Sequence, residues 1–178
     1  MLFIDYVNLN AKAGERPRFI ILIGLPGSGK TTWRKTKVAQ GYKGVVINPD
    51  DIRKMVFGVY FDPKKEHDVW EYICGKLRRA LLKGESICFD ATNVKKKRRK
   101  ALIKLGHEYN AYIEAIYFKV PSEVVLKRNV KRPADERVPL GIMMRMIRNI
   151  QPPELSEGFD SVEVIDTAMT GQKVENAT

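Results

Sequence analysis

The most informative segment of this chain reads Phe19-Ile20-Ile21-Leu22-Ile23-Gly24-Leu25-Pro26-Gly27-Ser28-Gly29-Lys30-Thr31. Its first part is a short, apolar, partly β-branched run, typical of a strand buried on both faces of a parallel sheet. The remainder matches the glycine-rich phosphate-binding pattern G-x-x-x-x-G-K-[ST], placed after a strand and before a helix as that pattern requires. A strand, a P-loop and a helix are therefore predicted in this order.

The predicted loop is expected to bind ATP. Glycines let successive backbone N–H groups converge on an anion, and the N-terminus of the next helix adds partial positive charge. Lys30 can reach the β- and γ-phosphates, and Thr31 offers a hydroxyl to Mg²⁺. A glycine-rich turn with an incidental lysine is the alternative. The expected ATP-binding residues of this segment are Gly24, Leu25, Pro26, Gly27, Ser28, Gly29, Lys30, Thr31 and Thr32.

Predicted strands and helices alternate along the chain. Strands are expected at 19–23, 45–47, 86–90, 112–120 and 161–165, and helices at 31–40, from 50 onward, and at 63–83, 94–109, 122–131 and 143–150. This alternation implies right-handed crossovers and an α/β fold of three layers, a parallel sheet flanked by helices, with ligands at the carboxyl ends of the strands. We expect an N-terminal extension at 1–17, one P-loop domain at 18–167 and a flexible tail at 168–178.

Acidic residues follow two of the expected strands. Asp50 comes just after the second strand and Asp90 ends the third, so both should reach the sheet edge that carries the loop. Asp50 is a candidate general base for an attacking hydroxyl, and Arg53 a candidate to grip an acceptor phosphate. Asp90 is a candidate to hold Mg²⁺ through water or, with Asn93, to orient the acceptor. Helix capping is the structural alternative, by Asp50 for the helix after the second strand and by Thr92 or Asn93 for the helix after the third.

Six consecutive basic residues, 95–100, begin the helix expected at 94–109. The macrodipole disfavours positive charge at a helix N-terminus, which suggests that an external anion offsets the cost. Lys and Arg outnumber Asp and Glu by 32 to 21, a net charge of +11, and such a field concentrates anions. Contact with nucleic acid and a plain solvated face are the two interpretations of this run.

The stretch 132–139 holds two prolines between two expected helices and is predicted to be a mobile lid. Arg128, Arg132 and Arg137 are candidates to close over the transferring phosphoryl group, where a guanidinium offsets charge on the equatorial oxygens. These arginines join the expected ATP-binding residues. Lys30 and Asp50 are the expected catalytic residues outside the lid.

The composition is that of a single globular domain. The chain has 178 residues, of which 44% are hydrophobic and 30% charged. We find no secretory signal and no apolar run of membrane-spanning length, so we expect a cytoplasmic protein without a membrane partner. Cys74 and Cys88 lack metal-ligand spacing and predict neither a disulfide framework nor a zinc site.

In combination these motifs resemble those of the polynucleotide 5′-hydroxyl kinases, especially the phage type. The likeness spans about residues 18–165 and is most specific at 48–53, at 120–132 and at Val138-Pro139. It implies a P-loop kinase fold and transfer of the ATP γ-phosphoryl group to a 5′-hydroxyl end of DNA or RNA.

The resemblance also implies roles for single residues. Asp50 would be the general base and Arg53 would bind the acceptor phosphate, while Asp90 would help to place the acceptor. Lys30, Thr31 and Arg132 would engage the ATP phosphates and Mg²⁺, so the expected catalytic residues are Asp50, Lys30 and Arg132. No Asp-x-Asp-x-Thr motif follows the lid, so no phosphatase activity is expected.

Two other functions fit part of the pattern. A small-molecule kinase of the zeta-toxin-like type also carries a P-loop and a strand-end Asp near an Arg, although the basic helix argues against it. A nucleic-acid-binding module that holds ATP without transferring phosphate would need Asp50 only as a cap. The sequence leaves the oligomeric state open.

Overall fold

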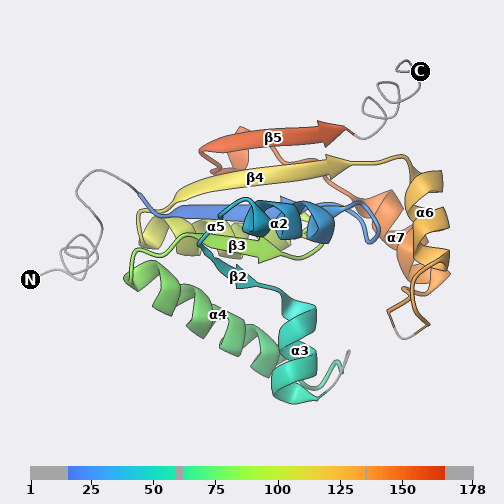
Figure 1. Ribbon diagram of the computed structural model, residues 1–178, viewed down its shortest axis with the longest axis horizontal. Coiled ribbons are helices and arrows are strands. Elements are labelled where there is room, and N and C mark those ends of the chain that lie inside the picture. Colours follow the sequence, from blue (N-terminus) through green and yellow to red (C-terminus); the bar gives the residue numbers. More distant parts are fainter. Residues whose placement is uncertain (1–15, 59–61, 135, 167–178) are drawn as a thin grey trace, which may run out of the picture.

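The computed structural model of the protein describes residues 16–58, 62–134 and 136–166. A central sheet carries helices on both faces (Figure 1). Except for residues 16 and 17, the extension expected at 1–17 lies outside the described residues, and so does the tail expected at 168–178.

The sheet is parallel throughout and has the strand order β2-β3-β1-β4-β5. Its strands are β1 (Arg18–Ile23), β2 (Val45–Ile47), β3 (Ile87–Asp90), β4 (Tyr112–Lys119) and β5 (Ser161–Asp166). The predicted strand positions agree with these to within one residue at each end. The α/β fold predicted from the sequence, with a parallel sheet flanked by helices, is confirmed.

The helices connect consecutive strands as crossovers. They are α2 (Lys30–Ala39), α3 (Pro49–Phe57), α4 (Glu66–Leu82), α5 (Lys96–Glu108), α6 (Ser122–Val130) and α7 (Leu140–Asn149), with a short 3₁₀ turn, η1 (Leu155–Glu157). The predicted helix at 143–150 begins earlier, because Pro139 provides the non-helical N-cap from which α7 starts.

Two hydrophobic clusters hold the layers together. On one face of the sheet, α4 and α5 cover β1 and its neighbours, and the α4 residues Ile73, Leu77 and Leu81 lie there at helical spacing. On the other face, Trp33 of α2 packs against the cluster that contains Phe118. The central strand is consequently buried on both sides, as its unbroken apolar run predicts.

A third cluster lies at the carboxyl ends of the strands. Leu25 of the loop after β1 packs there with Val94, with Val125 of α6 and with Met143 of α7. In Figure 1, α6 and α7 stand beyond the ends of β1 and β4. The phosphate loop and the predicted lid are thus attached to one apolar core.

Candidate active site

The loop between β1 and α2 is held close to two other elements. The backbone N–H of Gly24 donates to the Thr92 carbonyl at 2.9 Å, which ties the loop to the end of β3. Gly27 has a φ of +79°, and an added Cβ would lie 3.3 Å from the Cβ of Arg128 on α6. Only glycine fits this conformation and this close approach.

Lys30 is buried and lies within the loop. Its Nζ donates to the carbonyls of Gly24 and Leu25 at 2.9 and 2.8 Å. Burial lowers the pKa of Lys30 to about 8, while nearby Asp90 and, more weakly, Asp50 raise it. Both strand-end carboxylates therefore lie within electrostatic range of the phosphate loop.

Asp90 is the centre of a hydrogen-bond network. Its side chain is almost fully buried, and three groups donate to the same oxygen, Oδ2: the Arg34 Nε at 2.8 Å, the Thr31 hydroxyl at 3.1 Å and the Asn48 Nδ2 at 3.4 Å. The ion pair with Arg34 supplies the charge partner that a buried carboxylate needs. Thr31 and Asp90, the two residues predicted to hold Mg²⁺, are thus in direct contact.

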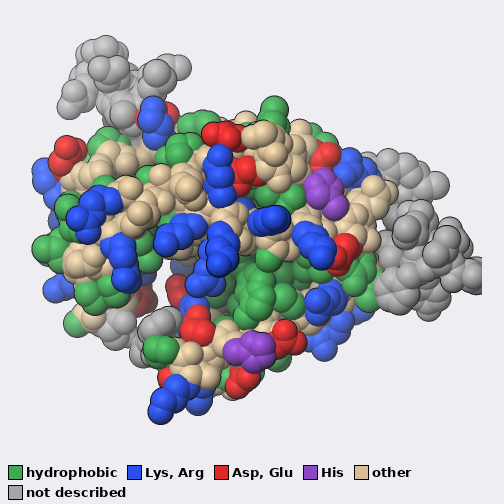
Figure 2. Space-filling view, turned by 180° about the vertical axis from the view of Figure 1, so that it is seen from behind, with side chains coloured by type: hydrophobic (Ala, Val, Ile, Leu, Met, Phe, Trp, Pro, Cys, Tyr) green, Lys and Arg blue, Asp and Glu red, His purple; other side chains and the backbone are tan. Residues whose placement is uncertain are grey.

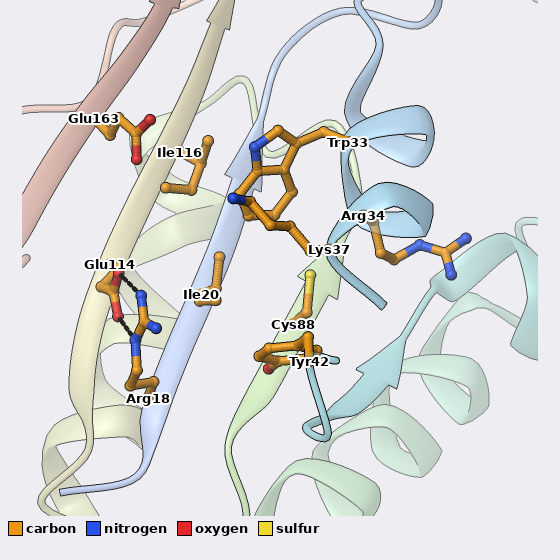
Figure 3. A pocket seen from close by; sticks show the side chains of 10 residues that line it. All are labelled: Arg18, Ile20, Trp33, Arg34, Lys37, Tyr42, Cys88, Glu114, Ile116 and Glu163. Carbon is orange, nitrogen blue, oxygen red and sulfur yellow. Dashed lines mark hydrogen bonds and ion pairs between the residues drawn. The ribbon is translucent and has the colours of Figure 1, made fainter. Parts of the chain in front are cut away.

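Sequence analysis did not single out Arg34. It follows the P-loop on α2 in a basic stretch, and nothing local marks it as the partner of Asp90. Arg34 also borders a cavity of about 150 Å³ between α2 and the sheet. Figure 3 shows its guanidinium pointing away from Glu114 and Glu163, the carboxylates that also border this cavity. None of the predicted site residues lines the cavity, and Arg34 is the residue that the cavity shares with the Asp90 network.

The structure corrects the capping alternative for Asp50. Asn48 is the N-cap of α3, and its side-chain oxygen accepts from the backbone N–H of Asp50 at 2.8 Å and of Asp51 at 3.2 Å. Pro49 occupies the first helical position. The Asp50 carboxylate is therefore not used as the cap, and its side chain is 86% exposed.

Arg53 binds two carboxylates of the protein itself. Its Nε and Nη2 donate to the two carboxylate oxygens of Glu66 at 2.7 and 2.9 Å, and its Nη1 donates to Asp50 at 2.5 Å. The guanidinium thus orients the Asp50 carboxylate and anchors α3 to α4. Sequence analysis missed Glu66, which lies beyond the next turn. Binding of an acceptor phosphate by Arg53 remains a prediction.

Asn93 is only 7% exposed, and its Nδ2 donates to the Leu22 carbonyl at 2.8 Å. It adopts a positive φ of 46°, a conformation that asparagine tolerates better than most residues. The N-cap of α5 is Lys95, with no side-chain cap, so the expected cap at Thr92 or Asn93 is wrong. These contacts favour an anchoring role for Asn93 over acceptor binding.

The predicted lid joins α6 to α7. At its base the Asn129 side chain bonds both backbone groups of Val138, donating to the carbonyl at 2.7 Å and accepting from the N–H at 3.1 Å.

The three arginines predicted to bind ATP differ in their contacts. Arg128 donates to the Gly27 carbonyl at 3.1 Å, which places it on the P-loop. Arg132 lies near enough to Lys30 to lower the pKa of that lysine. Arg137 donates to the Arg132 carbonyl, within the lid.

The basic run is not uniform. Arg99 is fully buried, donates to Glu157 at 2.6 and 2.8 Å and also binds the carbonyls of Asn93 and Gln151. Lys96 pairs with Glu154 at 2.8 Å. For these two residues the expected external anion is wrong, because carboxylates of the η1 region provide the negative charge.

The arrangement brings the expected chemistry to one sheet edge. An anion-binding loop, a hydroxyl next to a buried carboxylate and an exposed carboxylate oriented by an arginine all gather where the strands end.

A family model described as AAA domain matches residues 19–153, most of the chain. The chain belongs to this family of P-loop kinases.

The relatives of this P-loop kinase act on different acceptors. The L-seryl-tRNA(Sec) kinase of Methanococcus maripaludis is 27% identical over 161 residues, which cover 88% of this chain and 60% of the relative. The bifunctional polynucleotide phosphatase/kinase of Schizosaccharomyces pombe is 27% identical over 158 residues, which cover 86% of this chain and 35% of the relative. The chain therefore spans less than two thirds of the length of either relative.

Solved structures show the same fold. A chain of the Pnkp1/Rnl/Hen1 RNA repair complex superposes with a TM-score of 0.70 at 26% identity, covering 84% of this kinase and 48% of that chain. The APS kinase CysC of Mycobacterium tuberculosis superposes with a TM-score of 0.57 at 15% identity, covering 89% and 95%, which is a likeness of fold alone. This P-loop kinase is polynucleotide kinase-like. Within its described residues, no helix has the length and apolar character needed to cross a membrane.

Proposed function

We propose that this protein is an ATP-dependent polynucleotide kinase, which transfers the γ-phosphoryl group to a 5′-hydroxyl end of DNA or RNA. The observation that carries the proposal is a chain of hydrogen bonds from the phosphate loop to the start of α3. Thr31 and Asn48 both donate to Asp90, and the side chain of Asn48 accepts from the backbone N–H of Asp50, the candidate base. The similarity to the yeast polynucleotide phosphatase/kinase and to the RNA repair complex supports this choice of acceptor.

Asp50 is suited to the role of general base. Its carboxylate is exposed to an incoming acceptor, and Arg53 fixes its direction through a short hydrogen bond to Oδ1. A carboxylate so placed can accept the proton of the 5′-hydroxyl as that oxygen attacks the γ-phosphorus. Lys30 and the lid arginine Arg132 would offset the charge on the phosphoryl oxygens in the same step.

The site also fits a nucleotide with Mg²⁺. In the described residues no group of three or more His, Cys, Asp or Glu side chains could hold a metal ion by itself. Mg²⁺ commonly takes one or two protein ligands together with substrate phosphates and water. The Thr31 hydroxyl and, through water, Asp90 would supply the protein share, and the ion would neutralise phosphate charge.

A transfer assay with matched acceptors tests the proposal. The purified protein is incubated with γ-labelled ATP, Mg²⁺ and one of four acceptors: a 5′-hydroxyl oligonucleotide of DNA, the same sequence in RNA, a seryl-tRNA, or a pool of sugars and nucleosides. Label on the oligonucleotides, removed by phosphatase and absent with a 5′-phosphorylated control, is the expected result. Label on another acceptor alone would contradict it.

The second candidate is a kinase for a serine carried by tRNA. It is favoured by the match to the archaeal L-seryl-tRNA(Sec) kinase, which covers more of its relative than the match to the yeast enzyme does. Both candidates use a hydroxyl on a polyanion, so the positive charge of the chain fits either. The seryl-tRNA arm of the assay separates them.

A further inference from the structure

The outward face of α5 carries a line of lysines, Lys97, Lys100 and Lys104, which we call the lysine ridge. All three are exposed and recur at i, i+3 and i+7, so they lie on one side of the helix. The opposite side of α5 packs into the core. In Figure 2 lysine and arginine side chains form a row over α5 across this face of the molecule.

The basic residues that begin α5 run against its macrodipole. Helices α3, α4 and α6 each have acidic residues in the first turn and basic residues in the last. The first turns of α2, α5 and α7 have no acidic residue, and that of α5 begins with the three basic residues Lys96, Lys97 and Arg98. The last turn of α5 holds both His107 and Glu108. A basic first turn destabilises a helix. The basic start of α5 therefore suggests a role in binding rather than in stabilising the helix.

The lysine ridge is poorly compensated within the protein. Lys96 and Arg99 have carboxylate partners, but among the described residues Lys97 and Lys100 form no ion pair. Lys104 lies 3.9 Å from Glu108 in an exposed pair, which contributes little. The ridge therefore keeps its positive potential for an external anion.

One end of the lysine ridge lies toward the site edge. Helix α5 starts six residues after Asp90, so Lys97 lies at the end of α5 nearest the catalytic edge. From there to Lys104 the helix rises about 10 Å, which leads the charge away from the site along the molecular surface. A chain of phosphates that enters at Asp50 would find further cations on this path.

We propose that the lysine ridge binds the phosphate backbone of the acceptor nucleic acid beyond its reacting 5′ end. The inference rests on the proposed function, because it needs a polynucleotide acceptor. Three lysines that displace counterions from a single strand each add about 0.7 to the slope of binding against log salt. The ridge would thus favour long acceptors over mononucleotides without entering the chemical step.

The test is a triple variant, Lys97→Gln, Lys100→Gln and Lys104→Gln, which keeps Lys96 and Arg99 in place. For a 20-nucleotide single strand we expect KM to rise about tenfold and the salt slope to fall by about 2. For a 3′-mononucleotide acceptor, kcat and KM should change less than twofold. Oligonucleotides with uncharged methylphosphonate links beyond the first few nucleotides should lose the same advantage with wild-type protein.

The matched control removes three exposed lysines from the other face of the sheet, with Lys35→Gln, Lys37→Gln and Lys43→Gln. It should keep the preference for long acceptors. Equal losses in both variants, or an unchanged preference in the ridge variant, would overturn the inference. Wild-type protein that phosphorylates no nucleic acid would instead overturn the proposed function. The ridge variant should melt close to wild type, because its three lysines are exposed and the one ion pair that it removes, Lys104 with Glu108, is exposed as well.

Discussion

The Thr31 hydroxyl and the Asp90 carboxylate are hydrogen-bonded at 3.1 Å although 59 residues separate them in the sequence. The bond joins the first turn of α2 to the end of β3, two neighbouring points on the carboxyl edge of the sheet. Arg34 and Asn48 donate to the same oxygen and fix the carboxylate from two further elements. These contacts make Asp90 the junction between the phosphate loop and the start of α3.

Arg34→Gln should destabilise the protein by about 2–3 kcal/mol, because it leaves a nearly buried carboxylate without its charge partner. Urea unfolding without nucleotide measures this loss, and Mg²⁺ with ATP should restore part of it. Arg78→Gln, at an exposed arginine of α4, is the control and should stay within about 0.5 kcal/mol. An equally small loss for Arg34→Gln would refute the structural role of the pair.

Asp50→Asn should lower kcat by about 10² or more and leave ATP affinity nearly unchanged. The amide can still accept the hydrogen bond from Arg53, but it cannot take a proton at neutral pH. Steady-state kinetics with a 5′-hydroxyl oligonucleotide and an ATP titration give the two values. Asp51→Asn, the neighbouring exposed carboxylate, should keep normal turnover. Normal turnover by the Asp50 variant would remove this residue as the base.

ATP binding should take up protons above pH 8. Burial lowers the pKa of Lys30 from 10.5 to about 8, so at pH 8.5 most of the free protein carries a neutral Lys30. The triphosphate favours the charged form and raises this pKa again. By linkage, the proton uptake is larger at pH 8.5 than at pH 7. Calorimetry in buffers of different ionisation enthalpy measures it, and proton release at pH 8.5 would disprove the assignment.

Arg99→Met should cost about 3–5 kcal/mol, because it leaves Glu157 and two carbonyls without their buried donor. The double variant with Glu157→Leu should lose less than the sum of the single losses, since the two residues act as a pair. Arg98→Met, at the exposed neighbour, is the control and should be nearly neutral. Denaturant titrations of wild type, Arg99→Met, Glu157→Leu and the double variant give the coupling energy. Additive losses would show that the two side chains do not act together.

The sequence by itself determined the parallel α/β fold and the position of the phosphate loop. Both follow from local patterns: the apolar run before Gly24, the glycine spacing up to Lys30, and the alternation of strands with helices. The rule that parallel strands end at one edge placed Asp50 and Asp90 on the side of the loop, and the hydrogen bonds of Asn48 link both residues there. These inferences need only residues that are neighbours along the chain.

Only the tertiary structure decided which polar groups meet. Arg34 finds Asp90 56 residues away, and Arg99 finds Glu157 58 residues away. Arg99 occupies a basic run whose members look alike in sequence, and only helix packing decides which of them is buried. A buried charge requires a partner, but the identity of that partner depends on how distant segments pack, which no local pattern encodes.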